Sequence, residues 1–272
     1  MILSVVIITY NEESNIGRAL ASVQPLVADG KGEIIVVDSG STDRTVEIAK
    51  SCGAKVFVEA WKGYAAQKNS AIDKATGDWI LSLDADEELS NDPPPGAAGL
   101  SIPEFLQVVD RGRGQNDYPA DLNGFRFHRR NYFLGRWIRH GGFWPDPKLR
   151  LFKRGCGRFE ERAVHESLKV EGTIHRIGPD IVHRSYPTLA DYIDHMNHYS
   201  SLGAETAIAE GQRGFSLFKI TLRPLATFIY NYFLRLGFLD GREGLLLHLY
   251  HASYVSWKYS KAWELSRGKE ST

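Results

Sequence analysis

The sequence is poor in cysteine, and its 272 residues carry no net charge. Cys52 and Cys156 are too few for a disulfide framework and lack the Cys/His spacing of a zinc site, which favours structural roles in a reducing compartment. The Gly-x-Gly-x-x-Gly fingerprint is absent, which argues against a dinucleotide enzyme. Ser39 and Ser41 have no Ser/His/Asp pattern around them, so the sequence does not support a hydrolase triad.

Long hydrophobic runs are also missing. The apolar start at 1–8 is too short for a signal peptide and has no basic region, so it indicates a buried strand. The apolar stretch 224–239 is interrupted by Asn231 and Arg235, and it falls short of the roughly 20 apolar residues that a spanning helix needs. We therefore expect one or two globular domains without a membrane span.

The zero net charge conceals an asymmetry along the chain. Residues 1–120 hold 10 Lys and Arg against 18 Asp and Glu, whereas residues 121–272 hold 23 against 15. The two parts therefore carry −8 and +8. Such a division indicates an anionic ligand or contact with a membrane, unless it is only solvated surface charge that is unevenly spread.

Short apolar runs alternate with helical spacing over the first ninety residues. The runs typical of buried parallel strands are 3–8, 34–37, 79–83 and, more weakly, 56–58. Residues 15–27 and 42–52 have helical spacing, and 41–43 offers a cap for the second helix. This pattern predicts a doubly wound α/β domain that binds its ligand at the carboxyl ends of the strands.

Asp84 and Asp86 follow the third of the main strands. Two carboxylates at this spacing can approach one Mg²⁺ ion, which completes its shell with water and phosphate oxygens, although such a pair can also be a turn or a helix cap. Glu87 and Glu88 come next. Four acids within five residues repel one another unless a cation or a helix N-terminus compensates.

Asp38 ends the second strand in a turn where Gly40 lets a ligand approach the backbone. In nucleotide-binding α/β folds an acidic residue at this position reaches a ribose or a base. Ser41 and Asp43 can also cap the following helix.

The pattern lapses beyond residue 90. We expect a mobile loop or insertion over 90–124, with a short helix at 102–110. The later expected elements are strands at 125–133 and 149–152 and helices over 189–263, broken near 211–214 and 240–241.

Four segments in order, 4–13, 36–43, 68–69 and 75–87, resemble the nucleotide-sugar half of glycosyltransferase family 2, whose members are inverting enzymes with the GT-A fold. The resemblance implies a Rossmann-like, doubly wound, mostly parallel sheet, here with a helical C-terminal extension.

The resemblance also implies roles for individual residues. It assigns nucleotide-sugar binding to Thr9, Tyr10, Asn11, Glu12, Asp38, Ser39, Lys68 and Asp84. It further assigns a divalent cation, Mg²⁺ or Mn²⁺, to Asp84 and Asp86. We expect residues 1–90 to bind the nucleotide-sugar and residues 91–188 to bind the acceptor.

Later motifs narrow the resemblance. Segments 144–154, 164–166, 181–186 and 237–241 are similar to the subgroup that includes the lipopolysaccharide core β-1,4-glucosyltransferases acting on heptose.

Direct inverting transfer needs a base for the acceptor hydroxyl and cationic help for the leaving diphosphate. Glu166 is the first candidate base, Asp146 is the second, and Glu160 and Glu161 stay open. Arg150 lies on a predicted strand and either faces the diphosphate, which suits its planar guanidinium, or pairs with Asp146.

His165 and His183 can supply a further ligand beside Asp86, although a lone histidine is more often a hydrogen-bonded structural residue.

The C-terminal segment 189–272 mixes aromatic and basic residues over 215–263. Helices of this kind lie in a membrane interface against anionic lipid, or they pack across the acceptor side of the catalytic domain. No nucleic-acid recognition motif accompanies them.

We therefore expect an inverting glycosyltransferase that moves a sugar, glucose from UDP-glucose, to a saccharide acceptor on a lipid at the cytoplasmic face of the inner membrane. The alternatives are a polyprenyl-phosphate sugar synthase and a non-catalytic protein that binds nucleotide-sugars.

Overall fold

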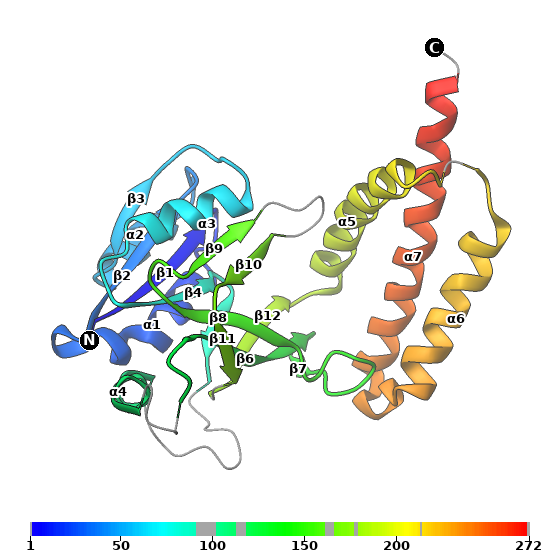
Figure 1. The fold of residues 1–272 in the computed structure, drawn as a ribbon. Helices are drawn as coiled ribbons and strands as arrows, with labels where there is room; N and C mark the ends of the chain where they lie inside the picture. Colours follow the sequence, from blue (N-terminus) through cyan, green and yellow to red (C-terminus); the bar gives the residue numbers. More distant parts are fainter. Residues whose placement is uncertain are drawn as a thin grey trace. The chain divides into compact units, whose positions relative to one another are not determined.

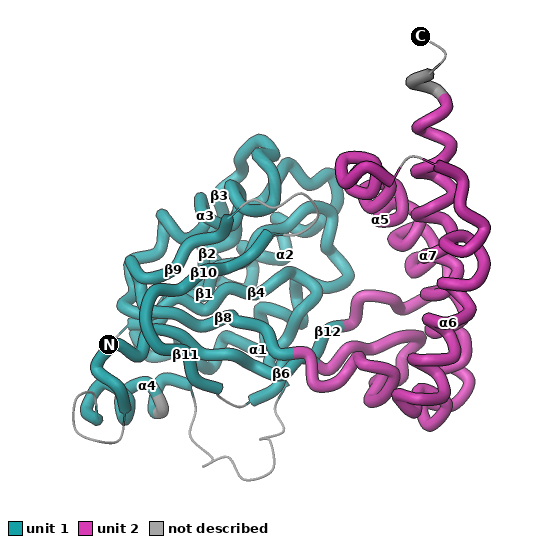
Figure 2. Tube along the Cα trace, turned by 45° about the vertical axis from the view of Figure 1, so that its right-hand side comes forward, with its two compact units in different colours: residues 1–129, 147–183 teal, residues 130–146, 184–272 magenta. Residues whose placement is uncertain are grey.

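A computed structural model describes residues 2–90, 102–112, 118–160, 166–176, 179–212 and 214–270. The chain forms two compact units (Figure 2). The first comprises Met1–Arg129 and Pro147–His183, and the second comprises Arg130–Asp146 and Arg184–Thr272.

Four parallel strands form the centre of the first unit, in the order β3-β2-β1-β4 (Figure 1). They are β1 (Leu3–Thr9), β2 (Gly32–Asp38), β3 (Lys55–Val58) and β4 (Trp79–Asp84). Short runs of Val, Ile and Leu form the three inner strands because helices cover the sheet on both faces and leave no side for polar residues. All four predicted strands are confirmed.

Helices cover the two faces of this parallel sheet. On one face α1 (Ile16–Val27) and α2 (Thr45–Ser51) pack against the apolar side chains of β1, β2 and β4. On the other face lies α3 (Tyr64–Asp73). The doubly wound α/β class is therefore confirmed.

Two helices depart from the sequence-based expectation. α2 begins at Thr45 instead of residue 42. Its N-cap residue is Arg44, and Asp43 Oδ1 accepts a hydrogen bond from the Thr45 N–H, the first of the helix, at 3.0 Å. The sequence does not predict α3, since its buried residues include two alanines, Gln67 and Lys68, and only Ile72 is large and apolar.

Beyond β4 the sheet is mixed, with several antiparallel pairs and one further parallel pair, between residues 173–176 and the strand at 122–133. β8 (Pro147–Lys153) pairs with β4 and with β6 (Leu122–Phe133), and β12 (Ile181–Tyr186) then pairs with β5 (Glu87–Leu89). The remaining strands are β7 (Arg136–Trp137) and β11 (Thr173–Arg176), beside β6, and the separate pair β9 (Gly157–Glu160) and β10 (Ser167–Val170). The predicted parallel arrangement thus applies to β3-β2-β1-β4, and the strands at 125–133 and 149–152 are confirmed.

The predicted loop over 90–124 lies partly outside the described residues. Within it, the expected short helix is confirmed as α4 (Ile102–Gly112).

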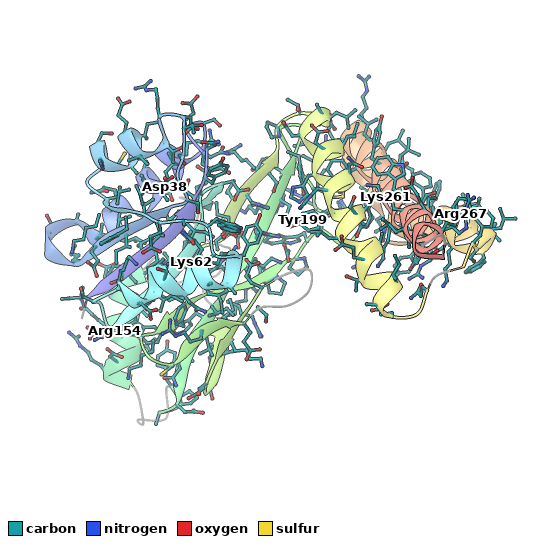
Figure 3. All side chains as sticks on the ribbon, turned by 90° about the horizontal axis from the view of Figure 1, so that it is seen from above. Asp38, Lys62, Arg154, Tyr199, Lys261 and Arg267 are labelled. Carbon is teal, nitrogen blue, oxygen red and sulfur yellow. The ribbon has the colours of Figure 1, made fainter. Side chains whose placement is uncertain are left out.

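Three helices dominate the second unit: α5 (Leu189–Ala209), α6 (Arg223–Ile229) and α7 (Gly241–Glu270). The predicted breaks near 211–214 and 240–241 are confirmed. Lys261 (Figure 3) connects α7 to α5. Its ammonium donates hydrogen bonds to Asn197 Oδ1 at 2.6 Å and to Ser200 Oγ at 2.7 Å, and both of these residues lie on α5. Among the described residues, no helix combines the length and the apolar character needed to cross a bilayer.

Asp240 gives the 237–241 motif a structural role. Its buried carboxylate accepts hydrogen bonds from the backbone N–H groups of Arg139, at 3.1 Å, and His140, at 2.8 Å. The motif therefore fixes the loop between β7 and β8 onto the start of α7.

Candidate active site

The carboxyl ends of three parallel strands lie next to one another in the first unit. Thr9 is the register partner of Asp38, and Ile8 is the partner of Asp84. Polar residues that are far apart in the sequence therefore meet at one edge of the sheet, where ligands of open α/β sheets bind.

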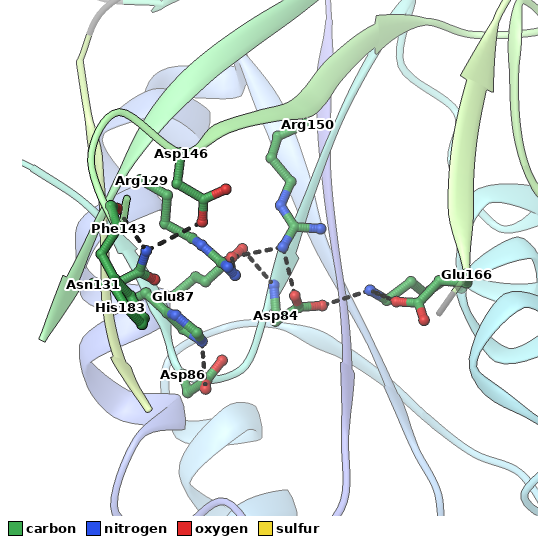
Figure 4. A network of polar contacts seen from close by, with 11 residues as sticks. Asp84, Asp86, Glu87, Arg129, Asn131, Phe143, Asp146, Arg150, Glu166 and His183 are labelled. Carbon is green, nitrogen blue, oxygen red and sulfur yellow. Dashed lines mark hydrogen bonds and ion pairs between the residues drawn. The ribbon is translucent and has the colours of Figure 1, made fainter. Parts of the chain in front are cut away.

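Asp84 is held between two cations (Figure 4). Its Oδ1 lies 2.7 Å from Lys68 Nζ, and its Oδ2 lies 2.5 Å from Arg150 Nη2. Arg150 also pairs with Glu87 Oε1 at 2.6 Å, so its ion pairs are with Asp84 and Glu87 and not with Asp146, the partner considered from the sequence. Both oxygens of Asp84 already have a cationic partner.

Lys68 links this carboxylate to Glu166. Its ammonium lies 2.6 Å from Glu166 Oε1 and 5.1 Å from the centre of the Phe159 ring, and only 4% of its side chain is exposed. The side-chain amide of Asn69 exchanges hydrogen bonds with the backbone N–H and C=O of Phe159, at 3.0 Å and 2.9 Å. These bonds attach β9 to α3. The partner of β9 is β10, which begins one residue after Glu166.

These contacts set the charge states of the network. Burial raises the pKa of Asp84, but Arg150 and Lys68 outweigh it, and the net pKa lies well below the ordinary value. The pKa of Glu166 is lowered in the same way, because Lys68 outweighs burial. The network therefore stabilises the fold above the ordinary carboxyl pKa, and this stabilisation is lost as the pH falls through the lowered values.

Asp86 has a different partner, since its Oδ2 lies 3.1 Å from His183 Nε2. Burial opposes ionisation of Asp86, and His183 lowers its pKa below the ordinary value. A carboxylate oxygen suits Mg²⁺ or Mn²⁺, and neutral imidazole is a common metal ligand. Asp86 beside His183 is therefore better placed to hold a divalent cation than Asp84, whose two oxygens already pair with cations. Within the described residues, no group of three or more His, Cys, Asp or Glu side chains is arranged to hold a metal ion.

Glu12 belongs to the same edge. The pKa of Glu12 is raised by burial, and the negative charges of Asp86, Asp43 and Asp84 raise it further. Its carboxylate accepts a hydrogen bond from Asn15 Nδ2 at 2.7 Å. An additional cation beside Asp86 would relieve this repulsion.

Asp38 organises the turn that follows β2. Its buried carboxylate accepts from the backbone N–H groups of Gly40 and Ser41, both at 2.9 Å, and from the Ser41 hydroxyl. Ser41 Oγ in turn accepts from the Asn11 N–H at 2.8 Å, and Asn11 Oδ1 accepts from the Thr42 N–H at 2.8 Å. The turns after β1 and β2 are therefore bound to each other.

Three side chains, two at this edge and one on α3, have buried polar atoms that form no hydrogen bond with a described residue. They are Thr9 Oγ1, Ser39 Oγ and both amide atoms of Gln67. Buried polar groups are normally hydrogen-bonded, so such atoms are suited to a ligand or to water. Tyr10 beside them is 56% exposed.

Asp146, the second candidate base, belongs to the other unit, where its Oδ2 accepts a hydrogen bond from Asn131 Nδ2 at 3.1 Å. Glu160 pairs with Lys169 at 2.6 Å in an exposed position. Glu161 and His165 lie outside the described residues.

Sequence reasoning missed Glu87, Arg129 and Gln67 as members of the site. Glu87 is fully buried and also lies 3.3 Å from Arg129 Nη1. The crowding of acids at 84–88 indicated that cations must lie nearby. It did not indicate which ones, because the cations that pair with these acids come from α3, β6 and β8, which are distant in the sequence.

Comparisons with known proteins identify the family of the chain. The model of glycosyl transferase family 2 matches residues 4–100. The chain is 30% identical to an uncharacterized glycosyltransferase of Rickettsia typhi, over 97% of this chain and 87% of that protein. It is 31% identical to the lipopolysaccharide core biosynthesis glycosyltransferase LpsC of Rhizobium meliloti, over 88% of this chain and 82% of that protein. The chain belongs to glycosyltransferase family 2.

A similar solved structure is glucosyl-3-phosphoglycerate synthase from Mycobacterium tuberculosis, in complex with Mn²⁺, UDP and glucosyl-3-phosphoglycerate. It is 26% identical, the match covers 47% of this chain and 44% of that one, and the TM-score is 0.35.

Arg150→Met tests the network. The substitution leaves buried Glu87 and half of the Asp84 carboxylate without their main cation, so the free energy of unfolding should fall by about 3–5 kcal/mol in urea titrations at pH 7. Arg158→Met is the matched control, since its ion pair with Asp73 is exposed and should cost about 1 kcal/mol or less. Equal losses in the two variants would contradict a dominant role for the network.

Proposed function

We propose that the chain is an inverting hexosyltransferase that moves glucose from UDP-glucose to a saccharide acceptor of a lipid-linked glycan such as the lipopolysaccharide inner core. The relative LpsC, whose name gives a role in lipopolysaccharide core biosynthesis, supports the acceptor class. The four motifs, three at the ends of strands and one on α3, support the nucleotide-sugar donor.

One observation carries the proposal. A carboxylate that can accept a proton, Glu166, shares the buried Lys68 with Asp84, whose strand end lies beside those of Thr9 and Asp38. A base and a candidate donor-binding edge therefore belong to one connected group of side chains.

In the proposed reaction, Glu166 takes the proton from the acceptor hydroxyl as its oxygen attacks the anomeric carbon. The bond from that carbon to the diphosphate oxygen breaks on the opposite side, which inverts the configuration. Lys68 keeps Glu166 ionised before the reaction. An anionic donor that drew the ammonium of Lys68 away would make Glu166 a stronger base.

Asp86 and His183 would hold the divalent cation, which supplies positive charge to the leaving diphosphate when bound. Arg150 and Lys68 orient Asp84 at the same edge, so that its carboxylate keeps one position beside the donor. Thr9 and Ser39 offer free hydroxyls to the nucleoside. We place this activity at the inner face of the cytoplasmic membrane, where a lipid-linked acceptor is within reach.

Asp86→Ala tests the metal assignment. Loss of this ligand should reduce sugar transfer roughly 100-fold or more while the fold stays intact, because the leaving diphosphate loses its cation. Mass spectrometry of the product measures transfer, and circular dichroism checks the fold. Asp73→Ala, at an exposed ion pair, should retain wild-type activity. Full activity of Asp86→Ala would remove Asp86 from the site.

Glu166→Gln tests the base. The amide cannot take a proton, so turnover should fall by about 10²–10⁴-fold while UDP-glucose still binds in calorimetry. Glu160→Gln, an exposed position on β9, should leave turnover unchanged. If Glu166→Gln kept its turnover and Asp146→Asn lost it, Asp146 would be the base.

A further inference from the structure

The helical segment from Leu217 to Leu234 in the second unit is apolar on two sides. It consists of α6 between two π-helical turns, Phe218–Leu222 and Tyr230–Leu234. One side packs on α7: Ser256 Oγ on α7 donates to the Ile220 carbonyl at 2.8 Å, and the Tyr232 ring lies 6.2 Å from that of His248.

The other side of this segment is open to solvent. An exposed row runs along it at spacings of four, three, four and four residues, which places its members on one side of a helix. Its members are Phe218, Leu222, Leu225, Ile229 and Phe233, each between 44% and 62% exposed.

The row is the centre of a larger surface, which we call the 215–239 face. Of the 22 large apolar side chains exposed among the described residues, 12 lie within these 25 positions. Besides the row, the face includes Phe215, Leu217, Tyr230, Leu234, Leu236, Phe238 and Leu239. Apolar surface gathered in this way marks an interaction site.

The charge of the face has one sign. Residues 214–239 contain Lys219, Arg223 and Arg235 and no Asp or Glu. Within the described part of the chain, none of these three cations forms an ion pair with a carboxylate. Arg223 lies over the Tyr259 ring at 5.1 Å, Arg235 lies over the Tyr230 ring at 5.8 Å, and Lys219 donates to Gln212 Oε1 at 2.9 Å.

We propose that the 215–239 face docks in the interface of an anionic lipid bilayer, with the row inserted among the acyl chains and the cations against the headgroups. Apolar and aromatic side chains beside cations that form no ion pair among the described residues fit such a surface. A second copy of the chain is the poorer occupant, because a two-fold contact would bring these cations together without acids.

This inference rests on the proposed function and adds an anionic membrane as a partner, since the 215–239 face would bring the enzyme to a lipid-linked acceptor. Vesicle binding needs neither donor nor acceptor, so the two proposals can fail separately.

Flotation of the full chain with lipid vesicles tests the role of the 215–239 face. Wild-type protein should float with phosphatidylglycerol/phosphatidylcholine vesicles at least tenfold better than with phosphatidylcholine alone, and added salt should weaken the binding. Phe218→Glu and Phe233→Glu should each reduce flotation about tenfold or more, and Arg223→Glu should reduce the preference for anionic lipid. Val108→Glu, at an exposed apolar position on α4, adds the same charge outside the face and should float like wild type.

The Val108→Glu control and a check of the fold distinguish loss of membrane binding from misfolding. Circular dichroism and UDP calorimetry should be unchanged in the variants, since the substituted side chains are exposed. Failure of the wild type to float, or equal flotation of Phe218→Glu and Val108→Glu, would overturn the proposal. So would a wild-type dimer in sedimentation that Phe218→Glu converts to a monomer, because the face would then bind a second copy. Loss of transfer with vesicle binding intact would contradict only the proposed function.

Discussion

The ion pairs around Asp84 and Glu87 are the constraint on which the rest of the site depends. Glu87 is fully buried and Arg150 nearly so, and charges at such depth are tolerated only when they are paired. Their pairing joins the end of β4 to β8, and Lys68 extends the same group to α3 and Glu166. Elements from distant parts of the sequence are therefore held in one arrangement by electrostatics and not only by apolar packing.

The sequence predicts the parallel half of the sheet well, because buried parallel strands are short apolar runs whatever their partners. It does not predict the network. Lys68 and Glu166 are 98 positions apart, and Lys68 lies on a helix without a marked apolar stripe. Glu87 resembles any solvated acid, since glutamate is rarely buried. The alternation around Arg150 indicated a strand but not which carboxylates would receive its guanidinium.

Charged residues have different surroundings in the two units. In the first unit, Lys68, Arg129 and Arg150 partly neutralise the carboxylates at the strand ends, and Asp86 pairs with the imidazole of His183, which is compatible with the proposed divalent cation. In the second unit, Arg223 and Arg235 lie over aromatic rings beside exposed apolar side chains. The proposed donor binding and the proposed lipid binding would thus use separate groups of charges, although most other surface charges only solvate the protein.

The stereochemistry of the product tests the central claim most directly. Wild-type protein, UDP-glucose, Mg²⁺ or Mn²⁺ and a heptose-containing core acceptor should give a new glucoside whose anomeric proton in NMR has the large coupling of a β linkage, since direct displacement inverts the α linkage of the donor. An α-linked product would contradict a single displacement with Glu166 as the base. Absence of any glucoside, with the donor intact, would contradict the assigned reaction itself.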